Sequence, residues 1–435
     1  KPFKDMTSSY RTIIILTVAA LIAALEITMA PTASAQRVRT GIDVLESNGF
    51  AQLQGKRIGL VTNPTGVDRY LNSTIDVLNS APGVELVALF GPEHGVRGNA
   101  HAGEHIEGQA VDPSTGVPIF SLYGKTRLPS AEQFQGLDAI VYDIQDIGCR
   151  SYTYISTMGN VMKVAACEGV EMIILDRPNP LGGLKIEGPG VEDSLISFVG
   201  QYDIPYIYGL TCGELATLLN EEGMLTVKDS RGQDSTVKCR LTVVPMEGWT
   251  RDMDFSTTGL LWVPSSPHIP TVDAAYLYPA TGILGELGVV SIGVGYTLPF
   301  GMIACEGMDA DVLASRLNTL YLPGVLFRPI YATPFYGSLK GREIGGVQIY
   351  ITDFNAARLS EIQFHVMQVL HEMIPGFDPF AKAAASRLRM FDKVTGTEEV
   401  RTAFSRRYRF EDISSIWYGF AAEFRKLAEK YYLYK

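Results

Sequence analysis

Five short apolar runs, separated by segments with helix-compatible patterns, dominate the sequence between residues 40 and 225. The runs are RIGLVT (57–62), ELVALF (85–90), PIFSLY (118–123), AIVYDI (139–144) and MIILD (172–176). Strands that read as unbroken apolar runs and alternate with helices are typical of a parallel sheet covered on both faces. The sequence therefore predicts an α/β fold built on a Rossmann-like, doubly wound parallel sheet.

Helix-compatible segments lie between these runs, at 72–80, 129–135, 151–168 and 211–222. The last segment opens with Thr211 and carries Glu214 three residues later, which is the spacing of a capping box. No GxGxxG motif follows the first apolar run, so the sequence does not predict a dinucleotide site. We expect no cofactor.

The pattern changes after residue 245. GVQIYITD (346–353) reads as a strand, and residues 358–374 and 413–432 have the apolar spacing of amphipathic helices. We therefore expect a Rossmann-like catalytic domain over residues 36–245 and a smaller α+β auxiliary domain over residues 246–435.

The N-terminus has the features of an export signal. Lys1, Lys4 and Arg11 precede an apolar run from Ile13 to Leu25, and the run is followed by PTASAQ. These are the parts of a secretory signal peptide, here over residues 1–35 with cleavage after Ala35, and the run is shorter than the roughly 20 residues of a spanning helix. We expect a periplasmic or secreted protein without a stable membrane span after cleavage. An uncleaved anchor is the alternative.

The balance of charge limits the partners. The formal net charge is −10, whereas nucleic acids and anionic membranes attract basic surfaces. We expect no nucleic-acid partner, and the charge leaves a small-molecule or glycan substrate open.

Polar residues gather where the predicted strands end. Ligands of doubly wound sheets bind outside the carboxyl ends of the strands, so these residues are expected to meet in one crevice. An ordinary set of surface turns is the alternative. The candidates are Asn63 after the first run; Glu93, His94 and Arg97 after the second; Asp143, Gln145, Asp146, Arg150, Tyr152 and Tyr154 after the fourth; and Asp176, Arg177 and Asn179 after the fifth.

The chemistry that suits these residues is carboxylate catalysis. Glu93 stands in LFGPEHG (89–95) at the end of an apolar run, where partial desolvation would favour a general acid. Glycoside cleavage uses a second carboxyl group, for which Asp143 and Asp146 are candidates. Tyr152, Tyr154, Trp249 and Trp262 could stack on a sugar. A metal site at His94, His101 and His105 is the weaker alternative, because these histidines fall in a glycine-rich stretch.

The longest of these motifs resemble the NamZ-type exo-β-N-acetylmuramidase family, formerly a domain of unknown function. The resemblance covers about residues 38–435. It implies a Rossmann-like N-terminal domain, a smaller C-terminal domain and an active site between them. It also implies removal of terminal N-acetylmuramic acid from the non-reducing end of peptidoglycan fragments, with Glu93 as the catalytic residue. The motifs that carry it are LFGPEHGVRG, DIQDIGCRSYTYISTM, DRPNPLGG, GLTCGELA and SSPHIPT.

The chain departs from the family pattern at several substrate-binding candidates. Tyr208 and His268 replace a usual His and Asn, and Glu286 is kept in a stretch that lacks the usual Arg. That Arg would pair with the lactyl carboxylate of muramic acid, so another cation is needed. The candidates for that cation are Arg97, Arg150, Arg177 and Arg251.

These departures leave two alternatives open. The chain could be an exo-hydrolase for a related amino sugar, or a muropeptide- or sugar-binding protein without turnover. If the chain is a glycoside hydrolase, we expect His94 and Arg150 to orient the reacting groups. The sugar's own 2-acetamido group can then replace a protein nucleophile.

Overall fold

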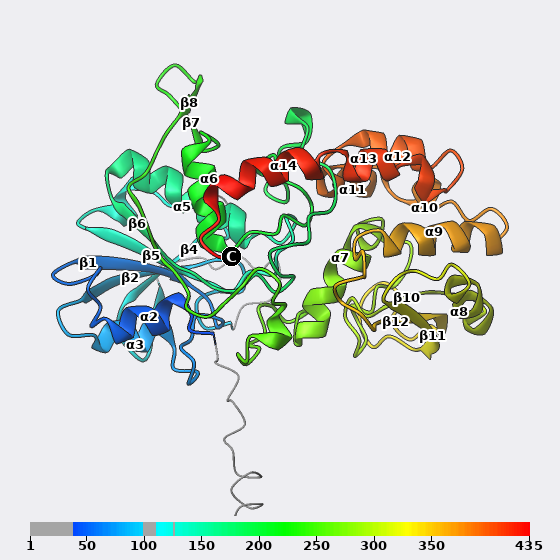
Figure 1. Cartoon of the computed structure of the whole chain (residues 1–435), viewed down its shortest axis with the longest axis horizontal. Coiled ribbons are helices and arrows are strands. Elements are labelled where there is room, and N and C mark those ends of the chain that lie inside the picture. The colour runs from blue at the N-terminus through cyan, green and yellow to red at the C-terminus, as the bar shows by residue number, and fades with distance from the viewer. Residues whose placement is uncertain (1–37, 99–109, 125–126) are drawn as a thin grey trace, which may run out of the picture. The chain divides into compact units, whose positions relative to one another are not determined.

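The strand-and-helix alternation of the first half of the chain forms a seven-stranded sheet in the computed structural model, which describes residues 38–98, 110–124 and 127–435 (Figure 1). The predicted runs at 57–62, 85–90, 118–123, 139–144 and 172–176 are all strands of this sheet. The strands are β1 (Arg57–Thr62), β2 (Glu85–Gly91), β3 (Ala110–Val111), β4 (Pro118–Ser121), β5 (Ala139–Asp143), β6 (Glu171–Leu175) and β9 (Leu241–Val244).

The strand order is β3-β4-β2-β1-β5-β6-β9. All neighbouring pairs are parallel except β3 and β4. The chain builds outward from β1 through β2 to β4, and then returns to add β5 on the other side of β1. The carboxyl ends of β1 and β5 therefore form the topological switch point, where doubly wound sheets open a crevice.

Helices cover both faces of this sheet. Val141 of β5 packs in one apolar cluster with residues of α2 (Gly41–Ser47) and α3 (Thr74–Ser80). Its neighbours Ile140 and Tyr142 pack on the opposite face with α5 (Tyr154–Glu168) and α6 (Cys212–Glu221). Figure 1 shows these two helix layers on either side of the strands. Successive strand residues point to opposite faces, so an unbroken apolar run fills both layers, and the predicted fold class is confirmed.

Local capping fixes where α6 begins. The backbone nitrogen of Glu214 donates to Thr211 Oγ1 at 3.2 Å, and the Thr211 nitrogen donates to Glu214 Oε2 at 3.1 Å. These are the reciprocal bonds of a capping box. Two shorter elements complete this half of the chain, namely α4 (Ala131–Phe134) and the hairpin of β7 (Thr226–Lys228) and β8 (Asp234–Thr236).

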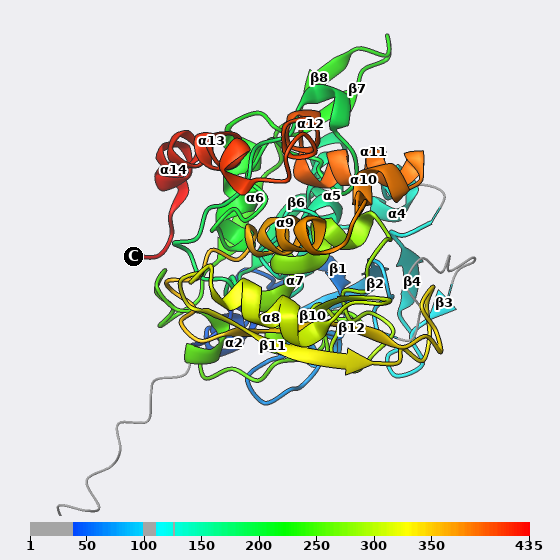
Figure 2. The same cartoon turned by 90° about the vertical axis from the view of Figure 1, so that its right-hand side faces the viewer.

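The second half contains a smaller antiparallel sheet in the order β10-β12-β11 (Figure 2). Helix α8 packs on β11 and β12, and α9 packs against α7 and α8. The predicted strand at 346–353 falls on β12, and the predicted helix at 358–374 falls on α9. The elements are α7 (Val272–Glu286), β10 (Met302–Cys305), α8 (Ala310–Asn318), β11 (Val325–Ala332), β12 (Ile344–Ile351) and α9 (Ile362–Met373).

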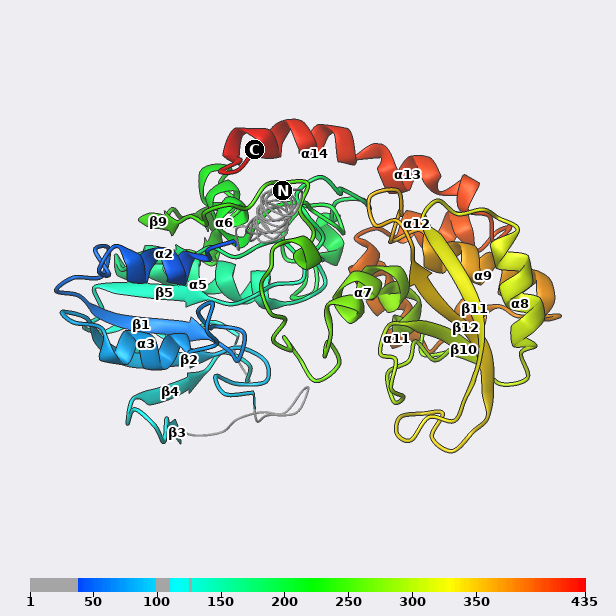
Figure 3. The ribbon, with the colours of Figure 1, turned by 60° about the horizontal axis from the view of Figure 1, so that its bottom comes forward.

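A run of short helices ends the chain, and its last member returns to the first sheet (Figure 3). The predicted helix at 413–432 is broken after Gly419. Trp417 packs in the core of the second half, whereas Phe424 and Ala428 pack with α5 and α6. The limits of the two predicted domains stay a prediction. The helices are α10 (Pro379–Lys382), α11 (Ala385–Thr395), α12 (Glu398–Phe404), α13 (Ser414–Gly419) and α14 (Ala421–Ala428).

Within the part of the chain that the structure describes, none of the helices is long and apolar enough to cross a membrane. The predicted signal peptide over residues 1–35 lies outside the described residues.

Candidate active site

Glu93 and His94 lie in a tight turn directly after β2. The Gly95 nitrogen donates to the carbonyl of Pro92 at 3.0 Å, and His94 has a φ of 74°. A Cβ on Gly91 would lie 3.2 Å from the Cα of Gly95, so a larger residue at 91 would crowd the turn. The left-handed backbone costs a non-glycine residue roughly 1–2 kcal/mol. Such strain concentrates at functional sites, and here it holds an acid and an imidazole at a fixed position.

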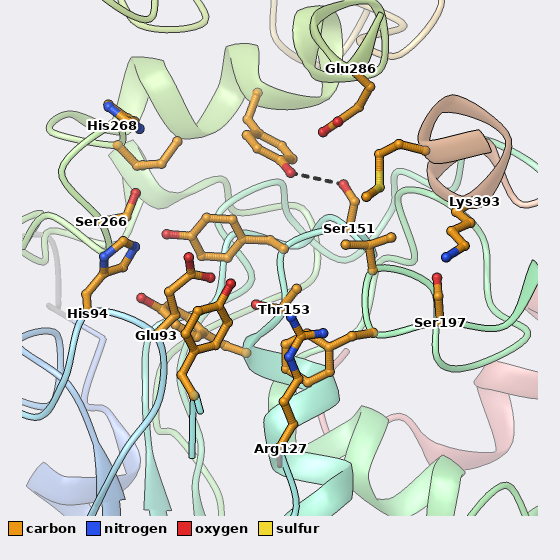
Figure 4. Close-up of a pocket in the computed structure, with 18 of the residues that line it drawn as sticks. Glu93, His94, Arg127, Ser151, Thr153, Ser197, Ser266, His268, Glu286 and Lys393 are labelled. Atoms are coloured by element: carbon orange, nitrogen blue, oxygen red, sulfur yellow. Dashed lines mark hydrogen bonds between the residues drawn. The ribbon is translucent and has the colours of Figure 1, made fainter. Parts of the chain in front are cut away.

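The two side chains line a cavity of about 520 Å³ (Figure 4). This volume lies within the range of small-molecule sites. Both halves of the chain build its walls, as the figure shows for the labelled residues. The walls come from the loops after β2 and β4, the segments 151–154, 197–199 and 266–269, helix α7, Phe300 and helix α11.

Tyr123 lies in the cavity wall with Glu93 and a cation. Burial, followed by the negative charge of Glu93, raises the pKa of Tyr123, so its phenol stays protonated. The guanidinium of Arg127 lies 5.2 Å from the ring centroid of Tyr123. The guanidinium of Arg127 also lies 4.0 Å from the ring centroid of Phe198, a distance typical of a cation–π contact.

Aromatic rings form the floor beside the acid. Tyr152 meets Tyr154 edge to face at 5.0 Å between centroids, and meets Tyr278 at 5.7 Å. The Tyr152 hydroxyl lies 2.9 Å from Ser265 Oγ, and burial raises the pKa of Tyr152 to about 12. The structure thus places both predicted stacking tyrosines in the cavity wall, with hydroxyls that remain neutral hydrogen-bonding groups.

His268 and Glu286, predicted from the altered family motifs, also line this cavity. Burial, followed by the charge of His94, lowers the pKa of His268, which favours the neutral imidazole. Burial raises the pKa of Glu286, and Arg387 lies 3.8 Å from its carboxylate. Six predicted residues therefore meet in one place, namely Glu93, His94, Tyr152, Tyr154, His268 and Glu286.

The acids after β5 and β6 lie elsewhere, in buried networks. Asp143 is fully buried and accepts from Arg177 Nε at 2.5 Å and from Thr74 Oγ1 at 2.5 Å. Asp176 accepts from Thr211 Oγ1 at 2.7 Å and from the Tyr434 hydroxyl at 2.6 Å, while burial raises its pKa to about 6. None of Asp143, Asp176 and Arg177 lines the 520 Å³ cavity.

Asp146 is the second candidate carboxylate, and it is buried as well. Burial raises its pKa to about 7, although its Oδ2 accepts from the Tyr208 hydroxyl and from the Gly148 nitrogen. A cavity of about 30 Å³ at the β1–β5 switch point, lined in part by Gln145 and Arg177, has room for about one water and none for a sugar. The expectation that all polar strand ends meet in one open crevice is therefore corrected, because ion pairs and hydrogen bonds fill the switch point.

Buried amides complete this filled region. Asn63 Oδ1 accepts from the Thr65 nitrogen at 2.9 Å, and Gln145 Nε2 donates to the Pro178 carbonyl at 2.7 Å. Asn179 Nδ2 donates to the Leu210 carbonyl at 2.9 Å. These amides satisfy backbone groups that would otherwise be buried without partners, a common reason for polar residues inside a fold.

Three further predicted cations and one tryptophan have structural partners. Arg97 pairs with Asp112 at 2.9 Å and Asp76 at 3.1 Å, and Arg251 pairs with Glu214 at 2.7 Å. Arg150 is buried and donates to the carbonyls of Pro189, Ile204 and Val394. Trp249 packs on Tyr434, with ring centroids 5.1 Å apart.

The positions of the arginines correct the expectation that Arg97, Arg150, Arg177 or Arg251 supplies a cation to the pocket. Arg127 and Lys393 line the pocket instead.

Sequence reasoning missed Tyr123, Arg127 and Lys393. Tyr123 is the last residue of the third predicted strand and Arg127 follows it, so the strand-end rule that found Glu93 also pointed to this region. Lys393 sits in the ordinary last turn of α11, and no local pattern distinguishes it from other helical lysines.

The histidine-based metal site was the weaker alternative from the sequence. Within residues 38–98, 110–124 and 127–435, no group of three or more His, Cys, Asp or Glu side chains is placed to hold a metal ion. His101 and His105 lie outside these residues, so the alternative metal site is not described.

Comparison with known proteins gives independent evidence for the family of this chain. The model of the exo-β-N-acetylmuramidase NamZ N-terminal domain matches residues 58–273, and that of the C-terminal domain matches residues 276–434. The peptidoglycan β-N-acetylmuramidase NamZ of Bacillus subtilis is 41% identical over 403 residues, which is 93% of each chain.

Two solved structures from Bacteroides fragilis, both DUF1343 family proteins, share the fold. One has a TM-score of 0.86 and 56% identity, the other a TM-score of 0.73 and 28% identity; each covers 92% of this chain and 99% of its own. The chain belongs to the exo-β-N-acetylmuramidase NamZ family.

Proposed function

We propose that this protein is an exo-acting glycoside hydrolase that releases terminal N-acetylmuramic acid from the non-reducing end of peptidoglycan fragments. The observation that carries the proposal is the position of Glu93, on a strained turn in the wall of a 520 Å³ cavity. Membership of the NamZ family supports the substrate class.

Glu93 is the general acid of this proposal. It donates its proton to the glycosidic oxygen while the bond from the anomeric carbon to that oxygen breaks, and the bonding electrons leave with the oxygen. Tyr123 orients the carboxyl group, and His94 lies beside it in the same turn. Positioned proton transfer of this kind contributes about 10²–10⁴-fold to the rate.

In this proposal the nucleophile is the 2-acetamido group of the sugar itself. Asp143 and Asp146 do not line the cavity. The ion pair of Asp143 with Arg177 and the hydrogen bond of Asp146 with Tyr208 would have to break before either carboxylate could contact a sugar. A neighbouring acetamido oxygen attacks the anomeric carbon from within the substrate, and water then opens the resulting ring.

The test is turnover of a chromogenic β-N-acetylmuramide and of the matching β-N-acetylglucosaminide by wild type, Glu93→Gln and Glu85→Gln. Glu85 begins the same strand but pairs with Arg57 on the surface, so its variant is the matched control. The proposal expects muramide release by wild type and Glu85→Gln, with loss in Glu93→Gln. Glucosaminide release alone would assign a related amino sugar. Binding of muropeptide without release of either sugar would identify a binding protein.

We propose in addition that the protein is exported, since its substrate class is found outside the cytoplasm. The support is the charged and apolar pattern of residues 1–35. Cell fractionation followed by N-terminal sequencing tests this, and a periplasmic or secreted form beginning at Gln36 is the expected result. A cytoplasmic form that keeps residues 1–35 would contradict it.

A further inference from the structure

The cavity has a cationic side that the proposed hydrolysis does not use. Lys393 in the last turn of α11 lines the cavity, and Figure 4 shows its side chain directed toward Ser197. Among the residues that the structure describes, no ion pair involves Lys393, whereas the neighbouring Asp392 pairs with Arg401 at 2.7 Å. The ammonium group is therefore available to a ligand.

Ser197 adds a second independent observation. Its Oγ atom is buried and has no hydrogen-bond partner in the described part of the chain. A buried hydroxyl without a partner costs roughly 1–3 kcal/mol, and most buried polar atoms are satisfied in native proteins. Since Ser197 lines the same cavity, a ligand oxygen can supply the missing partner.

The other charges of the cavity leave this corner positive. Arg127 approaches from the loop after β4 and stacks on Phe198, the residue next to Ser197. Glu286, the second acid of the wall, lies 3.8 Å from Arg387, which offsets its charge. Two cations and an unpaired hydroxyl thus face the cavity on this side, in a chain whose net charge is −10.

We propose that Lys393 and Ser197, assisted by Arg127, bind a substrate carboxylate and determine which sugar the enzyme accepts. This inference rests on the proposed function, which makes the 3-O-lactyl carboxylate of the terminal muramic acid the ligand. Charged donors to a carboxylate form strong hydrogen bonds. N-acetylglucosamine has no lactyl group, so it leaves both Lys393 and Ser197 unpaired in the cavity, and a site built for a polar group rejects a ligand that lacks it.

The experiment compares kcat/KM for a chromogenic muramide, for the same substrate with its lactyl carboxylate converted to the amide, and for the glucosaminide. Lys393→Gln is expected to lower kcat/KM for the acid about ten- to one-hundred-fold and to leave the two neutral substrates unchanged. Ser197→Ala should lower kcat/KM for the acid by a smaller factor and should also leave the neutral substrates unchanged. Lys393→Arg should recover part of the activity that Lys393→Gln loses. Lys426→Gln is the matched control, because Lys426 is an exposed lysine in the last turn of α14.

Equal losses for acid and neutral substrates, or no loss at all, would overturn the proposal, because a merely structural lysine cannot change the ratio. A binding measurement keeps this test separate from hydrolysis. In the Glu93→Gln background, calorimetry with N-acetylmuramic acid and its lactyl amide should show a preference for the acid that Lys393→Gln removes. If wild type hydrolyses neither glycoside, the proposed function fails, while this preference still decides whether the carboxylate site exists.

Discussion

Two strand ends in the first sheet, on either side of β1, look alike in sequence and differ in the folded protein. The end of β2 carries Glu93 and His94 into an open cavity of about 520 Å³. The end of β5 carries Asp143 and Asp146 into a region whose remaining cavity is about 30 Å³. Both strands run parallel to β1, so both ends lie at the same edge of the sheet, and what differs is the set of groups around each end.

The difference teaches that a topological switch point can be closed by its own polar residues. Arg177 reaches across from the end of β6 to Asp143, and Tyr208 donates to Asp146. These contacts satisfy buried charges and hydroxyls inside the fold. The open cavity instead lies where β2 and β4 end, and helices α7 and α11 form its opposite wall.

The sharpest test of this comparison is Glu93→Gln. We expect kcat to fall about 10²–10⁴-fold, because the amide cannot donate the proton, while the free energy of unfolding stays close to that of wild type. Steady-state kinetics and urea unfolding on the same preparation check both expectations. A large loss of stability would place Glu93 among the structural acids instead.

The matching change at the closed strand end is Asp143→Ala, which should have the opposite signature. It leaves the buried guanidinium of Arg177 without its carboxylate, and breaking a buried pair in this way costs about 3–5 kcal/mol. Urea unfolding measures the loss, and activity per folded molecule should be retained. A combined Asp143→Leu and Arg177→Met variant should recover most of the stability. Full stability with lost turnover in Asp143→Ala would instead support Asp143 as a catalytic carboxylate.

The pH dependence of stability provides a third test, at Asp146. Its pKa is raised to about 7 by burial, above the value of about 4 in an unfolded chain. Between these two values the folded state binds more protons than the unfolded state, so this group makes stability fall as pH rises from about 4 to about 7. Asp146→Asn removes that dependence, and its stability relative to wild type should rise across this window by up to about 4 kcal/mol. Melting temperatures of both proteins between pH 4 and pH 8 check this, and parallel curves would contradict it.

The smallest effect is expected at the opposite edge of the same sheet. Glu85 at the start of β2 forms an exposed pair with Arg57 at 2.6 Å. Exposed pairs contribute about 0–1 kcal/mol, so Glu85→Ala should change the free energy of unfolding by no more than that and leave turnover unaltered. A loss comparable to that of Asp143→Ala would show that burial does not explain the contrast.

Much of the first half of the fold was predictable from local sequence. The run RIGLVT is β1 over the predicted residues, and Thr211 with Glu214 caps α6 where expected. These features depend on neighbouring residues, so a window of the chain contains the needed information. The break after Gly419 was not predicted, because the two sides of that helix pack on different cores, one in each half of the chain.

The candidate site was predictable in part for the same reason. Glu93, Tyr152 and His268 stand in recognisable motifs, and all three line the cavity. Lys393 stands in no motif and reaches the cavity only because α11 packs against α7. Arg150 stands in a long motif and is buried under backbone carbonyls instead.

The sequence by itself determined the doubly wound fold, the family and the acid that follows β2, because periodicity and motif are written in consecutive residues. Only the tertiary structure decided which polar strand ends stay open. Whether a carboxylate becomes a catalytic acid or a buried partner depends on its desolvation and on the cations and hydroxyls that face it. Asp143 faces the guanidinium of Arg177 and Asp146 faces the hydroxyl of Tyr208, whereas Glu93 faces an open cavity. Long-range packing therefore gives different surroundings to acids that occupy similar places in the sequence.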